Sequence, residues 1–213
     1  MNATDLLQVD RRVPLDFMAR RYGRLAGHHH LVIWDRQTKQ SRAISVSRLD
    51  EVVDELLTRG AEVDAYFGWS TQPGDLGPRS RGRNATALGS PGVMIDVDFK
   101  GEAHKNEALP CSEAEVFDWL QEIGAPKPTE ARLSGNGMYL DWLHPEPVVF
   151  ANDNERNDYA AKVQAFHRAL RTLATQRRGW KLDSTHDLAR VTRMPGTFNH
   201  KTNPPKFVEL INV

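Results

Sequence analysis

Apolar residues recur at two spacings along the chain, and the spacing separates expected helices from expected strands. Apolar positions three and four residues apart indicate an amphipathic helix, whereas alternation or a short apolar run indicates a strand. The helical spacing occurs in three segments, at 47–60, 111–124 and 153–176. Strands are expected at the short apolar runs 30–35, 41–46, 63–70, 93–100, 130–134, 138–143, 180–183 and 206–213.

Local signals define the ends of these elements. Ser47 is positioned to cap the first helix and Gly60 to end it. Ser112 and Glu115 form a capping-box pattern at the start of the second helix. The segment 130–143 contains a Gly-Asn-Gly turn between two apolar runs, which is typical of a β-hairpin.

Two loop-rich stretches interrupt this pattern. Residues 71–91 are rich in Gly, Pro, Ser and Arg, and residues 184–205 are polar with room for one helical turn. Long loops inside a compact domain are usually functional or disordered. Strands and helices mix, and one connection is a hairpin, so we expect an α+β fold with two lobes and a mostly antiparallel sheet.

Composition narrows the class of protein. A chain of 213 residues suits a single domain over 1–213, with approximate lobes 1–88 and 89–213. Lys and Arg total 28, as do Asp and Glu, so nucleic-acid binding needs a local basic patch. The single cysteine, Cys111, rules out an intramolecular disulfide or a multi-cysteine zinc site and fits a reducing, cytoplasmic location. We expect no membrane span and no signal peptide in residues 1–12.

The segment "VMIDVDFK" places two charges in an expected strand. Asp96 and Asp98 share one face because side chains alternate along a strand, and Val93, Ile95 and Val97 take the other face. Two adjacent carboxylates repel, and a divalent cation between them would remove that cost. The alternative is a solvated strand end or a charge pair on an edge strand.

Two further segments carry candidate chemistry. In "RLSGNGMYLDW", Ser134, Gly135 and Gly137 allow close backbone approach to an anionic ligand, although a plain hairpin turn is equally compatible. In "LDSTHDLARVTRMPGTFNHK", a Pro-Gly turn lies among cations and suits a triphosphate. That segment contributes Asp183, Arg190, Arg193, Asn199 and Lys201. Its alternative is a loop stabilised by surface ion pairs, for which Asp187 is the nearby acid.

The order of these three motifs resembles the archaeo-eukaryotic primase superfamily, in particular the primase-polymerases of plasmids, phages and other mobile elements. The resemblance covers roughly residues 63–201, and "DLARVTRMPGTFNHK" is its most specific part. It implies a small α/β lobe packed on a lobe like an RNA-recognition-motif sheet. It also implies DNA primase or DNA polymerase activity on a single-stranded DNA template, with NTP or dNTP as substrate and two Mg²⁺ or Mn²⁺ ions as cofactors.

The resemblance assigns roles residue by residue. The catalytic, metal-binding carboxylates are Asp96, Asp98 and Asp183, with Asp187 as the substitute for the third. The nucleotide contacts are Ser134, Tyr139, Arg190, Arg193, Asn199 and Lys201. The chain lacks the G-x-x-x-x-G-K-[ST] pattern of a helicase, so unwinding is expected from a separate partner or a fused region.

One position departs from the family. Tyr139 stands where the second motif usually has a histidine, and His144 lies too far along the strand to replace it. A phenol donates a hydrogen bond but carries no positive charge. This departure keeps two other functions open: a single-stranded-DNA-binding replication initiation or accessory module, and a metal-dependent nuclease.

Template contacts are harder to locate. Arg79, Arg81 and Arg83 lie in the loop before the aspartate strand and are candidates for DNA binding, unless they form a solvated basic loop. The histidines 28–30 do not predict a metal site, because adjacent strand residues alternate faces. Four tryptophans are expected to pack in the core: Trp34, Trp69, Trp119 and Trp142. Core packing is also favoured for Trp180, for which the alternative is stacking on a base beside the basic segment 171–181.

Overall fold

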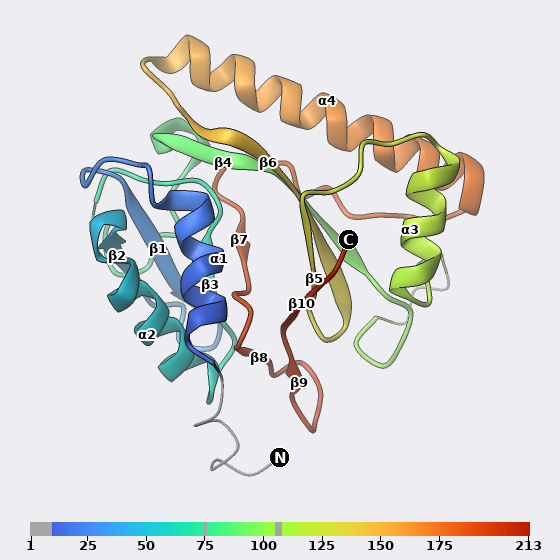
Figure 1. Ribbon diagram of the computed structural model, residues 1–213, viewed down its shortest axis with the longest axis horizontal. Helices are drawn as coiled ribbons and strands as arrows, with labels where there is room; N and C mark the ends of the chain where they lie inside the picture. The colour runs from blue at the N-terminus through green and yellow to red at the C-terminus, as the bar shows by residue number, and fades with distance from the viewer. Residues whose placement is uncertain (1–9, 75, 105–107) are drawn as a thin grey trace.

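The computed structural model describes residues 10–74, 76–104 and 108–213 and contains helices and strands in both halves of the chain (Figure 1). The helices are α1 (Arg12–Tyr22), α2 (Leu49–Gly60), α3 (Glu113–Glu122) and α4 (Asp153–Arg178). The strands are β1 (His30–Asp35), β2 (Ser41–Ser45), β3 (Ala65–Gly68), β4 (Gly89–Asp98), β5 (Glu130–Leu133), β6 (Gly137–Val149), β7 (Val191–Thr192), β8 (Phe198–Asn199), β9 (Lys206–Phe207) and β10 (Glu209–Ile211).

These strands form two four-stranded antiparallel sheets and a small ribbon. The first sheet has the order β2-β1-β3-β7, and the second has the order β10-β5-β6-β4. Strands β8 and β9 make the ribbon. The predicted α+β class, the mostly antiparallel pairing and the β5–β6 hairpin are therefore confirmed.

Each sheet has its own helical cover (Figure 1). Helices α1 and α2 bury residues such as Phe17, Val53 and Leu56 in a core with the first sheet. That core reaches the second sheet through Met94 and Tyr139. The sheets are thus joined by apolar packing on the side where they face each other.

Helices α3 and α4 cover the outer face of the second sheet. Ile95 and Val97 on β4 point into this core, where Trp119 of α3 and Leu170 of α4 pack. Ile95 and Val97 are thus buried, as the alternation predicts, and Val93 on the same face is half-buried. Strand β4 has apolar neighbours on one face and the cleft described below on the other.

Capping explains where the two outer helices begin and end. Ser112 accepts a hydrogen bond from the Glu115 amide, and the Glu115 carboxylate accepts one from Cys111 N, so half of the predicted capping box forms. Asn152 caps α4 through the amide of Glu155. Gly179 ends α4 in the left-handed conformation, with φ of 71°, which glycine adopts without steric cost.

The expected start of α2 is wrong, and its expected end is confirmed. Ser47 does not cap it, because a short 3₁₀ turn at Val46–Arg48 comes first and Ser45 accepts the hydrogen bond from Ser47 N. Gly60 is the last residue of α2, and the cap residue Ala61 has a right-handed helical conformation. A Cβ at Gly60 would lie 2.7 Å from the Cβ of Thr197, so glycine is needed there for close packing.

Two expected strands are also corrected, and one helix was missed. Residues 180–183 form no strand. Their apolar residues Trp180 and Leu182 pack in the core with α3 and α4 and do not pair with a neighbouring strand. Residues 206–213 form two strands, since the chain changes partner from β8 to β5 around buried Val208. The missed helix is α1, whose buried Arg21 weakens the apolar pattern.

The division into lobes at residue 88 stays a prediction, and β7 pairs with β3 across that boundary. Within the described residues, no helix is long and apolar enough to cross a membrane. Residues 1–9, which include most of the segment expected not to be a signal peptide, lie outside the described part of the chain.

Candidate active site

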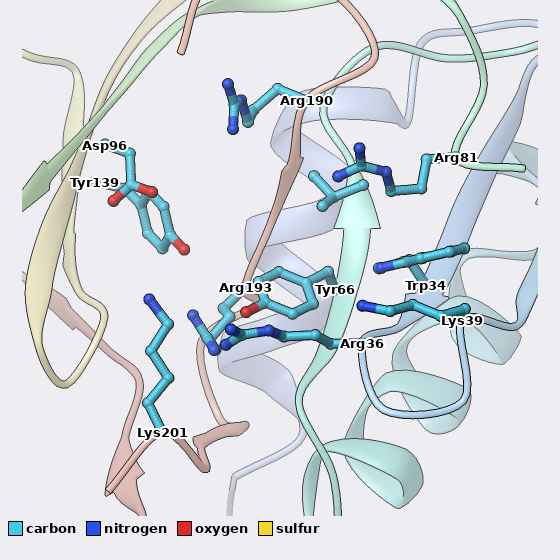
Figure 2. Close-up of a pocket in the computed structure, with 11 residues that line it drawn as sticks. Trp34, Arg36, Lys39, Tyr66, Arg81, Asp96, Tyr139, Arg190, Arg193 and Lys201 are labelled. Carbon is cyan, nitrogen blue, oxygen red and sulfur yellow. The ribbon is translucent and has the colours of Figure 1, made fainter. Parts of the chain in front are cut away.

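A cleft of about 520 Å³ lies where the two sheets face each other (Figure 2). Six of the residues that line it are Lys or Arg, and one, Asp96, is an acid. Cations surrounding a single carboxylate favour a polyanionic ligand. The cleft also falls in the size range of sites for small molecules.

Strand register aligns three side chains on the first sheet's side of the cleft. Trp34 of β1 is the cross-strand partner of Tyr66 of β3. Phe67 pairs with Thr192, so Tyr66 lies opposite Arg193, one residue beyond β7. Directly opposed residues point to the same face, and the row Trp34–Tyr66–Arg193 faces the cleft.

A second row comes from the other sheet. Asp96 of β4 pairs with Tyr139 of β6, and Tyr139 pairs with Arg132 of β5. Asp98 lies opposite Gly137, where a Cβ would collide with the carbonyl oxygen of Val97. The absence of a side chain at residue 137 therefore permits the close β4–β6 pairing that carries both aspartates.

A buried ionic network supports this second row. Arg132 donates to Asp141 at 2.9 Å, and Arg21 of α1 donates to the same carboxylate at 2.5 Å. Arg132 also bonds the hydroxyl of Thr192 on β7 at 3.2 Å, and its guanidinium lies 4.6 Å from the ring of Tyr139. Breaking a buried pair leaves an uncompensated charge, so the network fixes α1, β5, β6 and β7 beneath the cleft.

Asp96 and Asp98 share a face, and both carboxyl groups are destabilised as anions. Burial, and then the charge of Asp98, raises the pKa of Asp96 to about 7. Burial also raises the pKa of Asp98, although His104 opposes the shift, with its Nε2 atom 3.1 Å from Asp98 Oδ1. A half-buried pair of carboxylates with raised pKa values is chemically suited to a hard divalent cation.

The third predicted carboxylate lies close by but is not assembled with them. Asp183 is exposed, and its charge contributes to the raised pKa of Asp98. The loop that follows it is fixed to β4 by a bond of 3.4 Å from Asp96 N to Thr185 Oγ1. Among the described residues, no three His, Cys, Asp or Glu side chains are grouped in an arrangement that could hold a metal ion.

Arg193 is the most firmly placed cation of the cleft. Its side chain is buried, its Nη2 atom lies 2.7 Å from Asp64 Oδ1, and its guanidinium lies 4.3 Å from the ring of Tyr66. Burial would raise the pKa of Asp64, but the hydrogen bond and charge of Arg193 lower it. Arg193 Nε is buried without a hydrogen-bond partner in the described structure. Arg193 lines the cleft, so its guanidinium borders the space that an anion would occupy.

The other two predicted cations approach from neighbouring loops. Arg190 forms an ion pair with Asp187 at 2.7 Å, so Asp187, the substitute third carboxylate, is already paired. Lys201 extends toward Asp96 and Tyr139 in Figure 2, and its charge lowers the pKa of Asp96. The cleft thus places Arg190, Arg193 and Lys201 around one aspartate.

Ser134 and Asn199 are buried and do not line the cleft. Asn199 Nδ2 donates to the Ser134 carbonyl at 2.6 Å, and Asn199 Oδ1 accepts from Lys201 N at 3.1 Å. These bonds join the β5–β6 turn to the segment that carries Lys201. The structure therefore gives Asn199 a supporting position, and direct nucleotide contact by either residue stays a prediction.

Tyr139 lies beside Asp96 at the floor of the cleft (Figure 2). Burial, and then the charge of Asp96, raises the pKa of its phenol. The phenol is therefore neutral at physiological pH and can act as a hydrogen-bond donor. His144 contacts Tyr159 at 3.0 Å and does not line this cleft, in agreement with the expectation that it does not replace Tyr139.

The three loop arginines separate in space. Only Arg81 lines the cleft, with its guanidinium 5.6 Å from the ring of Trp34, while Arg79 and Arg83 are exposed away from it. Trp34 is half-buried at the cleft wall, so its expected place in the core is wrong. Trp69, Trp119 and Trp180 are buried as expected, and Trp142 is half-buried.

Several cleft residues were missed from the sequence. Arg36 and Lys39 lie in or beside the β1–β2 turn and resemble any polar hairpin turn, while Tyr66 resembles a core residue of an apolar strand. The signal that would have found them is the pairing of β1 with β3, which places Trp34 and Tyr66 side by side. The sequence does not reveal that pairing, because the order of the strands in the sheet is not known from it.

No protein-family profile matches the sequence, and no curated protein matches it. Among solved structures, it is similar to the archaeo-eukaryotic primase domain of the cyanophage S-2L primase-polymerase. The two are 15% identical, the match covers 95% of this chain and 90% of that chain, and the TM-score is 0.57.

The chain has an archaeo-eukaryotic primase fold. At this level of identity the likeness concerns the fold alone, and it confirms the primase-polymerase architecture expected from the motif order. A second similar structure is the catalytic domain of the primase RepB′ in complex with initiator DNA. It is 17% identical, with a TM-score of 0.47 over 94% of this chain and 85% of that chain.

Proposed function

We propose that this primase-fold chain catalyses template-dependent nucleotidyl transfer on single-stranded DNA, as a DNA primase, a DNA polymerase or both. The observation that carries the proposal is the cleft, in which a half-buried aspartate with a raised pKa is surrounded by six cations. A nucleoside triphosphate supplies the anionic phosphates that such cations bind. A role in the replication of a mobile element, with unwinding by a separate or fused helicase, belongs to the same proposal.

Asp96 and Asp98 would hold Mg²⁺ or Mn²⁺ through carboxylate oxygens, with Asp183 as the third ligand. The two aspartates fit this role because burial raises the pKa of both, and the charge of Asp98 further raises that of Asp96, so their anions favour a cation. When bound, the ions would lower the pKa of the attacking hydroxyl and neutralise the charge of the leaving group. Asp183 is exposed on a loop and not assembled with the pair, so it would be the ligand that depends most on the bound substrate.

The chain's cations orient the triphosphate. Arg193 follows β7 and lines the cleft with its guanidinium, while Arg190 and Lys201 approach from either side. Tyr139 donates a hydrogen bond from its neutral phenol, where a histidine could supply charge as well. The 3′-hydroxyl oxygen of the primer or first nucleotide forms a bond to the α-phosphorus, pyrophosphate leaves with the bridging oxygen, and the hydroxyl proton passes to solvent.

A second candidate function is binding of single-stranded DNA without catalysis, in an initiation or accessory role. Two observations favour it. Tyr139 is neutral where the family's motif has a histidine, and Asp98 is already in contact with His104 at 3.1 Å. A binding module would use the same basic cleft and would not require the three carboxylates to assemble.

The deciding experiment is labelled nucleotide incorporation on single-stranded DNA. NTPs and dNTPs are supplied separately, with Mg²⁺ or Mn²⁺, with and without a primer. Asp96→Asn is compared with Asp118→Asn, whose carboxylate is exposed on α3. Product that disappears only in Asp96→Asn supports transferase activity, and the primer-free lanes identify priming. DNA binding with no product under any condition supports the binding module instead.

A further inference from the structure

Trp34 differs from the chain's buried tryptophans in its surroundings. Trp69 Nε1 donates to Gly92 O at 2.9 Å inside the core, and Trp119 packs edge-on against Trp180. The Trp34 indole is instead half-buried and forms part of the cleft wall. A large aromatic face in a basic cleft is a platform on which a nucleobase can stack.

Arg81 is positioned over this platform. Its guanidinium lies 5.6 Å from the Trp34 ring centre, and its side chain is exposed (Figure 2). Within the described part of the chain, Arg81 forms no ion pair that would compete with this contact. An exposed, uncommitted guanidinium can move outward and cover a base that stacks on the indole.

The cleft separates aromatic and phosphate-binding groups along one row. Across the first sheet, Trp34 is followed by Tyr66 and then by Arg193, each on a neighbouring strand. Neighbouring strands are about 5 Å apart, so the backbones of Trp34 and Arg193 are roughly 10 Å apart. A nucleotide anchored by its phosphates at Arg193 would therefore extend its base toward Trp34.

We propose that Trp34 is the base-stacking residue for the incoming nucleotide and that Arg81 covers the bound base. The proposal rests on the proposed function, because it takes a nucleoside triphosphate as the ligand of the cleft. It adds a specificity: the indole recognises the aromatic plane of the base, which all nucleobases share, so the platform tolerates every base. Discrimination among bases is then left to pairing with the template.

The test separates base contacts from phosphate contacts by using a ligand without a base. Binding of dATP, dTTP and inorganic tripolyphosphate is measured by calorimetry in the presence of Mg²⁺. Trp34→Ala should weaken binding of both nucleotides roughly tenfold, in line with the loss of one stacked base, and leave tripolyphosphate unchanged. Arg193→Ala should weaken all three ligands. Arg81→Ala should weaken the nucleotides a few-fold, and Arg79→Ala should weaken none.

Trp34→Phe keeps an aromatic face and controls for misfolding, so it should retain most of the nucleotide affinity. Nucleotide binding should also change the tryptophan fluorescence of the wild-type protein but not that of Trp34→Phe. Unchanged nucleotide affinity in Trp34→Ala would overturn the inference, as would equal loss of nucleotide and tripolyphosphate binding. Loss of oligo(dT) binding alone would place the indole on the template and would overturn it too.

The inference and the proposed function fail in different ways. A wild-type protein that binds nucleotides through Trp34 but incorporates none refutes transferase activity and leaves the stacking role standing. A protein that incorporates nucleotides with equal KM in wild type and Trp34→Ala refutes the stacking role alone. Wild-type protein that binds no nucleotide refutes both.

Discussion

Replacing Asp96 by asparagine should stabilise the metal-free protein while removing its metal site. Burial and the Asp98 charge raise the pKa of this carboxyl from 3.8 to about 7 in the folded state. A difference of one pH unit corresponds to ~1.4 kcal/mol, so ionising Asp96 costs the folded state up to about 4 kcal/mol. The side chain borders an open cleft, and water there offsets part of the cost, so we expect about 2–3 kcal/mol at pH 8.

The sign of the pH dependence follows from the direction of the shift. Between about pH 4 and 7, the folded protein binds more protons at this residue than the unfolded chain, so its stability falls as pH rises. The penalty is absent below the unfolded pKa and complete above the folded one. Asparagine is neutral throughout, and the gain from the substitution should therefore grow by roughly 1–3 kcal/mol between pH 5 and 8.

Urea unfolding at pH 5, 6, 7 and 8, in EDTA, measures this difference directly. Asp118→Asn is the matched control, because its exposed carboxylate should change stability by less than about 0.5 kcal/mol at every pH. Added Mg²⁺ or Mn²⁺ should stabilise the wild type and leave Asp96→Asn unaffected. A variant no more stable than wild type at pH 8, or a gain independent of pH, would refute the assignment of Asp96 as a half-buried, destabilised anion.

The other predictions concern the cleft's supporting contacts. Asp64→Asn should lower the free energy of unfolding by about 3 kcal/mol and weaken nucleotide binding, because Arg193 loses its buried partner at 2.7 Å. Urea denaturation measures the first effect and calorimetry the second. Undiminished nucleotide affinity would contradict the role of Asp64. Arg193→Ala should weaken nucleotide binding more than Arg79→Ala in calorimetry, and equal effects would mean that the triphosphate lies elsewhere. Gly137→Ala should destabilise the protein by about 1–3 kcal/mol and reduce nucleotide incorporation, since the new Cβ would collide with the Val97 carbonyl. A Gly137→Ala variant as stable in urea as the wild type would show that β4 and β6 can move apart to accommodate the Cβ.

Local patterns were sufficient for the elements that form through their own residues. Helices α3 and α4 and the β5–β6 hairpin follow from spacing, caps and turn residues. The shared face of Asp96 and Asp98 follows from strand alternation alone. Elements shaped by distant neighbours were mispredicted, as at residues 180–183, where burial beneath two helices imitates a strand.

The candidate site divides in the same way. The aspartates and the cations Arg190, Arg193 and Lys201 could be found because they lie in compact motifs. The opposite wall could not, since Trp34 and Arg81 are separated by 46 other residues and meet only after the first sheet forms. Asn199 was assigned to the nucleotide by its place in the motif that carries the family resemblance. Its bond to the Ser134 carbonyl depends on tertiary contacts that the sequence does not display.

Strand β7 has a consequence for the order in which the protein can assemble. It completes the first sheet by pairing Thr192 with Phe67, about 125 residues earlier in the chain. When the ribosome has synthesised β1–β3, the first sheet therefore still has one open edge. That edge stays open through the synthesis of β4, β5, β6 and helices α3 and α4. Contacts so distant in sequence slow folding, and an open strand edge can pair with the wrong partner. Cleft formation should accordingly be a late event, with Arg193 arriving on the last strand to join β3.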